Sequence, residues 1–398
     1  MHVLKVLHKV ICKSAGNVHA TRLSAIHAGV KSLLNGSFLT VTALGRGLQS
    51  PALVKHNIKR MDRLLSNRHL QQERQGIYQS LCHYLCATQS RPVILVDWTD
   101  IVDRERLTLI RAALAVEGRA ITLYEAVYPL KHYNTPHTHK QFLNELKILL
   151  PAGCRPIVVT DAGFRGPWFK AVEALGWDWI GRIRNCVNYR LLSRLKWRYS
   201  QDLYYRASSK VKYLGAAELS SKRPYHCHLY LYKKPRQGRV ENRSIVHTIR
   251  HSHSRYFRKQ QKDPWLLATN LTPEELGAQA IIRLYSKRMQ IEECFRDLKS
   301  DRFGFGLALS RSKRIDRLNN LLLLAALATL CLWWIGYAAR AKQWQRHFQA
   351  NTVRHTHVLS VPFLALAVIR RQDYRLSVTE LIQARNQLLI FINEKNNV

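Results

Sequence analysis

Residues 91–98 read RPVILVDW, and residues 154–164 read CRPIVVTDAGF. Each stretch is a short apolar run that ends at a carboxylate, Asp97 in the first and Asp161 in the second. Apolar runs of this length are typical of buried strands. A carboxylate at the end of such a strand is held rigidly at the edge of the sheet, where α/β proteins place their sites. We therefore expect Asp97 and Asp161 to lie on adjacent strands and to share a divalent cation.

The residues between and after these runs predict the rest of an α/β core. Residues 107–130 read as two strands joined in a hairpin at Glu117-Gly118. Residues 138–151 and 166–176 are predicted helices, and residues 177–184 form a further strand. Three antiparallel strands, a helix, a parallel strand, a helix and a strand is the order of the ribonuclease-H-like fold. We predict that fold for the core.

The charge balance is the main compositional anomaly. The 398 residues include 63 Lys+Arg and 26 Asp+Glu, a formal net charge of +37, while 46% hydrophobic residues exclude wholesale disorder. Because self-repulsion on this scale is costly, we expect a polyanion on the surface, and nucleic acid is the first candidate. Residues 1–90 carry 12 Lys+Arg against 2 Asp+Glu, and residues 182–262 carry 21 against 3.

These patterns divide the chain into three predicted domains. Residues 1–90 are expected to be a helical DNA-binding domain, and residues 91–340 an α/β core. Residues 182–262 are interpreted as a basic, β-rich insertion in that core, in which HCHLYLYKK is the best strand and RQGRVENRSIVHTIRHSHSRYFRKQQKD a basic loop. Residues 341–398 are expected to be helical and are a candidate dimerisation region.

Residues 39–65, LTVTALGRGLQSPALVKHNIKRMDRLL, read as helix, turn, helix. Thr42 is the expected N-cap of the first helix, and Ser50-Pro51 is expected to open the second. The second helix presents a row of basic residues, as a helix that reads a DNA groove does: Lys55, His56, Lys59, Arg60 and Arg63. The alternative is a packing unit with a solvated basic face, and the surrounding charge favours DNA contact.

Residues 273–301 are predicted to form one long helix. At 100° per residue, four of its side chains share a stripe about 60° wide: Tyr285, Arg288, Glu292 and Lys299. Glu292 is thus a candidate third carboxylate, and Arg288 and Lys299 are candidate phosphate contacts. The alternative is an exposed helix face with a common Arg288–Glu292 pair.

Three carboxylates at one site suit phosphodiester chemistry. Two Mg²⁺ ions roughly 4 Å apart can activate a water or a 3′-hydroxyl and stabilise the leaving oxygen. Mg²⁺ takes hard oxygen ligands, which Asp97, Asp161 and Glu292 supply. Asp100 and Asp103 are expected in the loop after the first strand, where geometry is harder to hold. Taken alone, Asp97 or Asp161 would read as an N-cap or turn residue.

Residues 321–339, LLLLAALATLCLWWIGYAA, are uncharged and near the lower length limit for a membrane span. Basic residues flank both ends without a clear asymmetry, so we interpret this segment as a buried core helix. The eight cysteines are scattered and read as reduced thiols of a cytosolic protein.

Three segments, VDWTD, VTDAGF and YSKRMQIEECFRDLKS, resemble in order and spacing the bacterial DDE transposases of the insertion-sequence-four family. The last segment fits that family's Tyr-x2-Arg-x3-Glu-x6-Lys signature at Tyr285, Arg288, Glu292 and Lys299, without a departure. The likeness covers nearly the whole chain.

The resemblance implies a retroviral-integrase-like core in which Asp97, Asp161 and Glu292 are catalytic and bind two Mg²⁺ ions, with Mn²⁺ as a substitute. It implies cut-and-paste transposition through a DNA hairpin, followed by strand transfer into target DNA. The family stacks a flipped base on an aromatic side chain. Trp265 is the candidate platform and Met289 a candidate wedge, and the alternative for Trp265 is a core position.

The resemblance also implies partners and a location. The DNA partners are the inverted-repeat ends of the element and the target DNA, held by a homodimer in a synaptic complex, with host DNA-bending proteins as candidates. The expected location is the bacterial cytoplasm, at the nucleoid. Two other readings stay open: a non-catalytic or decayed protein that only binds element ends, and a membrane-surface protein that rests on charge and residues 321–339.

Overall fold

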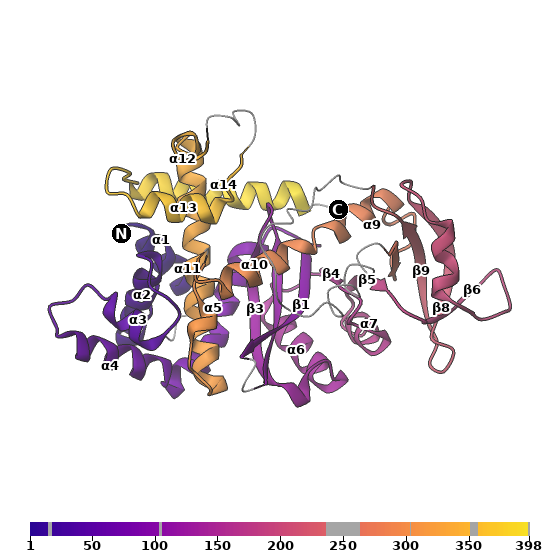
Figure 1. The fold of residues 1–398 in the computed structure, drawn as a ribbon, viewed down its shortest axis with the longest axis horizontal. Coiled ribbons are helices and arrows are strands. Elements are labelled where there is room, and N and C mark those ends of the chain that lie inside the picture. Colours follow the sequence, from indigo (N-terminus) through magenta and orange to yellow (C-terminus); the bar gives the residue numbers. More distant parts are fainter. Residues whose placement is uncertain (15–17, 103–105, 236–262, 303, 351–356, 397–398) are drawn as a thin grey trace, which may run out of the picture. The chain divides into compact units, whose positions relative to one another are not determined.

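The computed structural model describes residues 1–398 except 15–17, 103–105, 236–262, 303, 351–356 and 397–398 (Figure 1). The chain forms two compact units. The first comprises Met1–Ile157 and Lys287–Val398, and the second comprises Val158–Ser286. These two units are defined by how compactly their residues pack. The division into domains at 1–90, 91–340 and 341–398 stays a prediction.

The first unit is mainly helical around three strands. Its helices are α1 Val3–Ser14, α2 Ala20–Leu34, α3 Val41–Arg46, α4 Val54–Leu65, α5 Arg68–Cys86, α6 Pro136–Leu149, α10 Met289–Lys299, α11 Ile315–Ala341, α12 Gln345–Phe348, α13 Val361–Ile369 and α14 Val378–Asn396. Its strands are β1 Val93–Val102, β2 Leu107–Ala115 and β3 Ala120–Pro129.

The three strands form an antiparallel meander in the order β3-β2-β1. The predicted hairpin at Glu117-Gly118 is confirmed, and Gly118 takes a positive φ of 65° that glycine adopts without strain. The expectation that β1 ends at Asp97 is wrong. The strand runs on to Val102 because its backbone stays paired with β2, so Asp97 lies opposite Arg111 in mid-strand and Asp100 opposite Thr108. Asp103 lies outside the described residues.

Alternation along β1 separates two sets of contacts. Asp97 and Thr99 contact side chains of α10 or its N-cap, whereas Trp98, one residue on, contacts His139 of α6. Because successive side chains of a strand point to opposite faces, α10 and α6 cover opposite faces of this sheet. The helix that carries Glu292 therefore lies on the face that carries Asp97.

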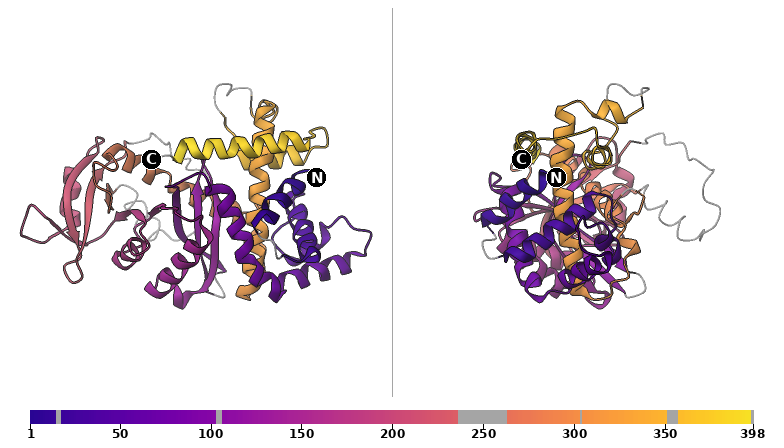
Figure 2. Two further views of the ribbon diagram at one scale, coloured as in Figure 1. Left: turned by 180° about the vertical axis from the view of Figure 1, so that it is seen from behind. Right: turned by 90° about the vertical axis from the view of Figure 1, so that its left-hand side faces the viewer.

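Helix α11 is the centre of the first unit (Figures 1 and 2). It is the one helix among the described residues that is long and apolar enough to cross a membrane, and 94% of its most apolar window is buried inside the protein. The N-terminal helices α2, α4 and α5, the strand β3 and the C-terminal helices α13 and α14 all contact it. The burial confirms the interpretation of residues 321–339 as a core helix.

Helices α3 and α4 form the predicted helix-turn-helix, with different boundaries. Thr40, rather than Thr42, caps α3, since its hydroxyl accepts a hydrogen bond from Ala43 N at 3.1 Å. Helix α4 begins at Val54, because the Ser50 hydroxyl closes a separate turn by accepting from Ala52 N. The two helices touch at Gly45.

The second unit extends one sheet through the predicted insertion. Its elements are β4 Ile157–Thr160, α7 Gly166–Glu173, β5 Asp178–Ile183, β6 Asn188–Leu191, β7 Arg198–Tyr199, β8 Lys212–Leu219, β9 Tyr225–Tyr232, β10 Trp265–Thr269 and α9 Ala278–Ser286. The strand order is β4-β5-β10-β9-β8-β6-β7. Four strands of the insertion thus continue the core sheet through β10, whereas most of the predicted basic loop lies outside the described residues.

The long helix predicted over residues 273–301 is in fact two helices. Thr272 and Glu275 form a reciprocal capping pair around a single turn, and α9 starts only at Ala278, after Gly277. The second break follows Ser286, whose hydroxyl donates to Arg283 O at 2.7 Å. The amides of Gln290 and Ile291 then bond three residues back instead of four. The local competition of a serine hydroxyl accounts for a break without glycine or proline.

We predict that Gly45→Ala destabilises the first unit by about 1–3 kcal/mol, because its Cβ would lie 2.4 Å from the Ile58 Cα. Chemical denaturation of the full chain measures this loss. Thr42→Ala, at an exposed position of the same helix, is the control and should change stability by less than about 0.5 kcal/mol. Equal stability of both variants would contradict close packing of α3 on α4.

Candidate active site

Two of the three predicted carboxylates share one arginine. Arg288, at the N-cap of α10, lies with Nη1 2.6 Å from Glu292 Oε1 and 3.4 Å from Asp97 Oδ2. The Arg288 and Asp97 side chains are 14% and 13% exposed, and Glu292 is 42% exposed. The two carboxylates thus meet at one partly shielded cation, which offsets the repulsion between them.

Lys299, the last residue of the signature, contacts the strand that carries Asp97. Lys299 Nζ donates to Thr99 Oγ1 at 2.7 Å, and Thr99 is two residues after Asp97 on the same face of β1. The Asp97 Oδ1 atom accepts a hydrogen bond from the Trp98 amide at 2.8 Å, which fixes the rotation of the carboxylate. The predicted stripe of Arg288, Glu292 and Lys299 therefore faces Asp97 and Thr99.

Asp161 lies in the second unit, directly after β4, as its position at the end of an apolar run predicts. Its Oδ1 accepts from Gly163 N at 2.8 Å, so the side chain closes a tight turn. A Cβ on Gly163 would stand 3.0 Å from that oxygen, which explains the glycine. The turn fixes one oxygen of Asp161.

Among the residues that the structure describes, no group of three or more His, Cys, Asp or Glu side chains forms a metal-binding cluster. Asp97 and Glu292 belong to the first unit and Asp161 to the second. Within the first unit, the hard oxygen donors that Mg²⁺ prefers are present in a pair, and the guanidinium of Arg288 lies against both.

The break between α9 and α10 puts the other predicted DNA-contact residues in different units: Tyr285 and Trp265 in the second, and Met289 in the first. Tyr285, at the end of α9, is 3% exposed, and its ring packs edge-on against Trp265 with the centroids 4.9 Å apart. Trp265 also contacts Tyr232 and is partly exposed at the start of β10. Met289, in the first unit, is 49% exposed, and its Sδ lies 3.4 Å from Arg288 Nη2.

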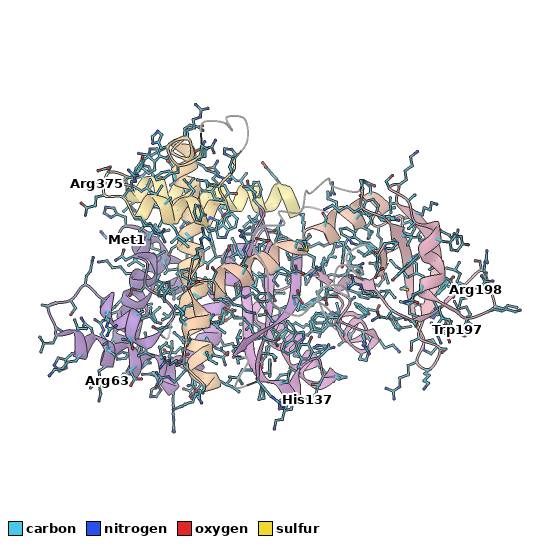
Figure 3. The ribbon with its side chains drawn as sticks, viewed as in Figure 1. Met1, Arg63, His137, Trp197, Arg198 and Arg375 are labelled. Atoms are coloured by element: carbon cyan, nitrogen blue, oxygen red, sulfur yellow. The ribbon has the colours of Figure 1, made fainter. Side chains whose placement is uncertain are left out.

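Helix α4 presents the predicted basic residues to solvent. The buried side of the helix carries Met61, Leu64 and Leu65. The exposed side carries Lys55, His56, Lys59, Arg60 and Arg63, and Figure 3 shows Arg63 at the surface of the unit. A positive face beside an apolar face is the arrangement that a helix needs in order to pack on its domain and meet phosphates.

Sequence reasoning missed a buried ion pair beside the site. Arg111, opposite Asp97 on β2, donates from Nε and Nη2 to Glu125 Oε2 at 2.8 and 2.6 Å, and Tyr78 donates to Glu125 Oε1 at 3.2 Å. Arg111 also lies over the Phe295 ring of α10. The sequence did contain a signal for this pair. Arg111 and Glu125 are charged residues within otherwise apolar strands, and such charges are rarely buried unless they are paired.

The comparison with known families gives one match. A model of the transposase DDE domain matches residues 88–331, which include β1, β4 and α10 with all three candidate carboxylates. The comparison with curated proteins found no match.

The indole beside Asp97 gives a pH prediction. Trp98 Nε1 donates to His139 Nε2 at 3.2 Å, and burial lowers the pKa of His139 to about 4 from 6.5. Between these values the unfolded chain binds a proton that the folded chain does not, so His139 costs stability as the pH falls through this window. From pH 7 to pH 5 we expect a loss of about 2 kcal/mol from this residue.

Urea unfolding of the wild type and of His139→Gln at pH 7 and at pH 5 measures this loss of unfolding free energy. Glutamine keeps an acceptor for Trp98 but does not titrate, so the variant should lose less stability on acidification. His137→Gln, at an exposed position of the same helix, should behave as the wild type (Figure 3). An identical loss in all three proteins would contradict the assignment.

Proposed function

Since the chain belongs to the family of transposases defined by the DDE domain, whose model matches 88–331, we propose that it carries out cut-and-paste transposition. The family assignment makes the protein a transposase that acts on DNA. We further place it in the insertion-sequence-four family, with a ribonuclease-H-like core and a sequence similar to the transposase of insertion sequence ten. The observation that carries the proposal is the shared contact of Asp97 and Glu292 with Arg288.

The donor set fits divalent metal ions. DDE transposases are divalent-metal dependent as a family. Asp97, Asp161 and Glu292 would hold two Mg²⁺ ions, or Mn²⁺ in their place, which when bound supply activation of the attacking oxygen and stabilisation of the leaving oxygen. The cationic Arg288 already lies against one oxygen of Asp97 and one of Glu292, which supports the convergence of the two carboxylates on a cation.

The proposed reaction sequence is the one that the resemblance to the insertion-sequence-four transposases implies. A water attacks the phosphorus at the element end and releases a 3′-hydroxyl. That hydroxyl attacks a phosphorus of the opposite strand, expels the 3′-oxygen of the flanking DNA and closes a hairpin. A second water breaks the new P–O bond of the hairpin and regenerates the 3′-hydroxyl, which then attacks a phosphorus of target DNA and expels a 3′-oxygen of the target strand. Arg288 and Lys299 extend from α10 on the Asp97 face of β1, where they are suited to hold phosphate oxygens through these steps. Tyr285 is the third proposed DNA contact of the motif.

DNA recognition is assigned to α4 and to the basic strands of the insertion. The five exposed basic residues of α4 follow the short turn after α3, which is the arrangement of a groove-reading helix. Trp265 is proposed as the stacking platform for a flipped base, because its ring is partly exposed and supported by Tyr232 and Tyr285. The exposed Met289 is the proposed wedge.

The assembly is proposed to be a homodimer that holds paired element ends, with residues 341–398 as the candidate dimerisation region. Host DNA-bending proteins are candidate partners, and the bacterial cytoplasm, at the nucleoid, is the proposed location. The burial of α11 inside the first unit supports a protein that acts on DNA away from a membrane.

We predict that Asp97→Asn, Asp161→Asn and Glu292→Gln each reduce cleavage of an element-end duplex by at least about a thousandfold in Mg²⁺. Each variant keeps its shape but loses a negative ligand. Glu293→Gln, which changes the neighbouring residue of α10, is the matched control and should cleave as the wild type. Gel assays of nicking and hairpin formation measure the rates. Cleavage by any one of the three at the wild-type rate would remove that residue from the site.

Binding of end DNA tests the assignment of α4. Single alanine substitutions at Lys55, Lys59, Arg60 and Arg63 should weaken binding, and each lost phosphate contact should make the slope of log affinity against log salt shallower by about 1. Fluorescence anisotropy at several salt concentrations measures both. Lys140→Ala, exposed on α6, is the control. Unchanged affinity and slope in all four variants would contradict DNA contact by this helix.

A further inference from the structure

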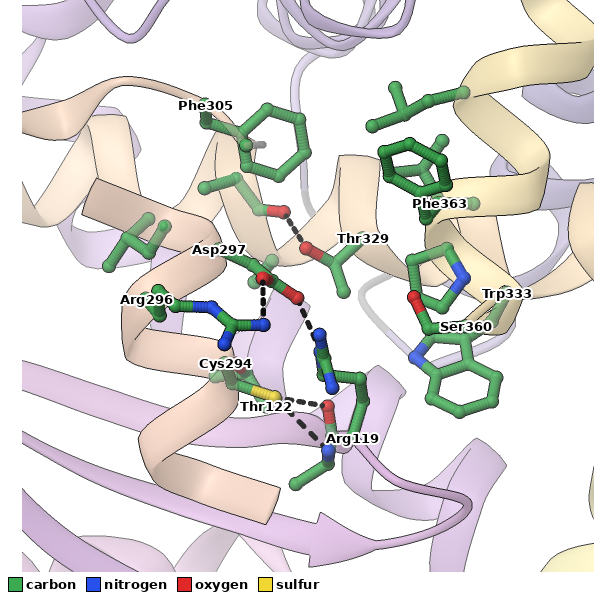
Figure 4. Close-up of a pocket in the computed structure, with 18 of the residues that line it drawn as sticks. Arg119, Thr122, Cys294, Arg296, Asp297, Phe305, Thr329, Trp333, Ser360 and Phe363 are labelled. Carbon is green, nitrogen blue, oxygen red and sulfur yellow. Dashed lines mark hydrogen bonds and ion pairs between the residues drawn. The ribbon is translucent and has the colours of Figure 1, made fainter. Parts of the chain in front are cut away.

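Two side chains of α10 bond to the backbone of the hairpin that β2 and β3 form. Gln290 Oε1 accepts a hydrogen bond from Val116 N at 2.8 Å, and its Nε2 donates to Val116 O at 3.4 Å. One turn along the helix, Cys294 Sγ accepts from Ala120 N and donates to Ala120 O, both at 3.0 Å (Figure 4). Each side chain thus engages both backbone groups of a single residue, and we call these two pairings the hairpin contacts.

The backbone side of the hairpin contacts is itself held in place. Val116 and Ala120 are 5% and 1% exposed, so their N–H and C=O groups need partners inside the protein. The Val116 amide also donates to Arg119 O across the turn, at a longer 3.3 Å. Glu117, in the turn, is anchored from α11, since Arg340 Nη1 lies 2.8 Å from its Oε2. The hairpin therefore gives α10 a fixed support.

The hairpin contacts lie on the edge of α10 opposite the candidate site. At 100° per residue, Gln290 and Cys294 each lie about 160° around the helix from Glu292. Phe295 lies between the two edges and is buried against the sheet. One edge of α10 is thus bonded to the hairpin, and the other carries Glu292 beside the arginine that also contacts Asp97.

We propose that Gln290 and Cys294 are positioning residues, which set the rotation of α10 about its axis and so the approach of Glu292 to Asp97. This role rests on the proposed function, in which Glu292 is a metal ligand. A rotation of about 20° would move a carboxylate 5–6 Å from the helix axis by about 2 Å. A misplacement of about 1 Å at a reacting centre can cost a hundredfold in rate.

The ion pair of the same turn cannot replace the hairpin contacts. Arg119 Nε lies 2.6 Å from Asp297 Oδ2 (Figure 4). The long arginine side chain can follow a rotation of the helix, because it has several rotatable bonds. A short side chain bonded to fixed backbone groups cannot follow in this way, and its hydrogen bonds weaken steeply as their angles bend. The hairpin contacts therefore resist the rotation.

The first test removes the amide of Gln290 with little change of volume. In Gln290→Met we expect cleavage of an element-end duplex to slow about tenfold and the Mg²⁺ concentration for half-maximal rate to rise about tenfold, as for other residues that hold a metal ligand in place. Affinity for end DNA without metal should stay within about twofold. Gln141→Met is the matched control, since this exposed amide donates to Glu145 within α6, and it should behave as the wild type.

The second test uses rescue by a conservative variant at Cys294. Burial raises the pKa of this thiol to about 11, so at neutral pH it keeps the proton that it donates to Ala120 O. Cys294→Ser keeps a donor and an acceptor at this position and should retain the wild-type Mg²⁺ requirement. Cys294→Ala keeps neither and should raise it about tenfold. Thermal unfolding shows whether each variant is folded, and this pair decides if Gln290→Met does not fold.

Binding of Mn²⁺ to the protein alone gives a readout that needs no DNA cleavage. Electron paramagnetic resonance of free Mn²⁺ measures the affinity of the site that Asp97→Asn removes. This site should bind Mn²⁺ about tenfold more weakly in Gln290→Met and in Cys294→Ala. Gln141→Met and Cys294→Ser should keep the wild-type affinity.

The outcomes separate this proposal from the proposed function. A folded Gln290→Met with the wild-type Mg²⁺ requirement and Mn²⁺ affinity would overturn it, and so would equal losses in Cys294→Ser and Cys294→Ala. The lack of an Asp97-dependent Mn²⁺ site in the wild type would overturn it as well. A wild type that cleaves no end DNA would instead refute the proposed function, and the Mn²⁺ affinities would then decide the role of the hairpin contacts.

Discussion

The apolar helix α11 has to be kept from water on every side, and the first unit is arranged around that requirement. A helix with no polar face cannot lie on a surface, so it needs several partners at once. Helices α2, α4 and α5 from the N-terminal segment, α13 and α14 from the C-terminal segment, and the strand β3 supply them. This burial joins the ends of the chain to the sheet that carries Asp97. The helix that presents the basic residues Lys55, Lys59 and Arg63 is thereby tied to the same core.

The candidate site depends on a second constraint, the placing of opposite charges. In a chain of net charge +37, Asp97 and Glu292 are among few acids, and both lie against Arg288. A guanidinium between two carboxylates stabilises their approach in a partly shielded place. In the proposed reaction, the two carboxylates would turn to metal ions and the arginine to a phosphate of the DNA. The group of Asp97, Arg288 and Glu292 therefore carries negative charge, although the chain as a whole is strongly positive.

Local sequence patterns predicted several strands, a hairpin and the core helix. The wrong predictions of where β1 and the long helix end have physical causes. The runs around Asp97 and Asp161, the hairpin at Gly118 and the apolar segment of α11 were predicted because period and composition are local properties. The extension of β1 past Asp97 was missed because a strand continues as far as its partner does, which only β2 decides. The break after Ser286 was missed because a serine hydroxyl competes with the helix without any glycine or proline signal.

For the candidate site, sequence reasoning proposed the residues but could not give their contacts. The spacing of Arg288, Glu292 and Lys299 predicted a common face. The contacts of Arg288 with Asp97 and of Lys299 with Thr99 are tertiary, between residues 191 and 200 positions apart. The buried Arg111–Glu125 pair belongs to the same class, since it depends on what packs against it.

The most direct test of the account asks whether one metal site unites Asp97, Asp161 and Glu292. Fe²⁺ can be exchanged into a magnesium site, and the hydroxyl radicals it generates with ascorbate and peroxide cut the polypeptide close to the ion. Mass spectrometry of the fragments should show cuts near residues 97, 161 and 292 together, suppressed by excess Mg²⁺ and absent in Asp97→Asn. Cuts confined to other segments, or cuts that persist in excess Mg²⁺, would contradict the account.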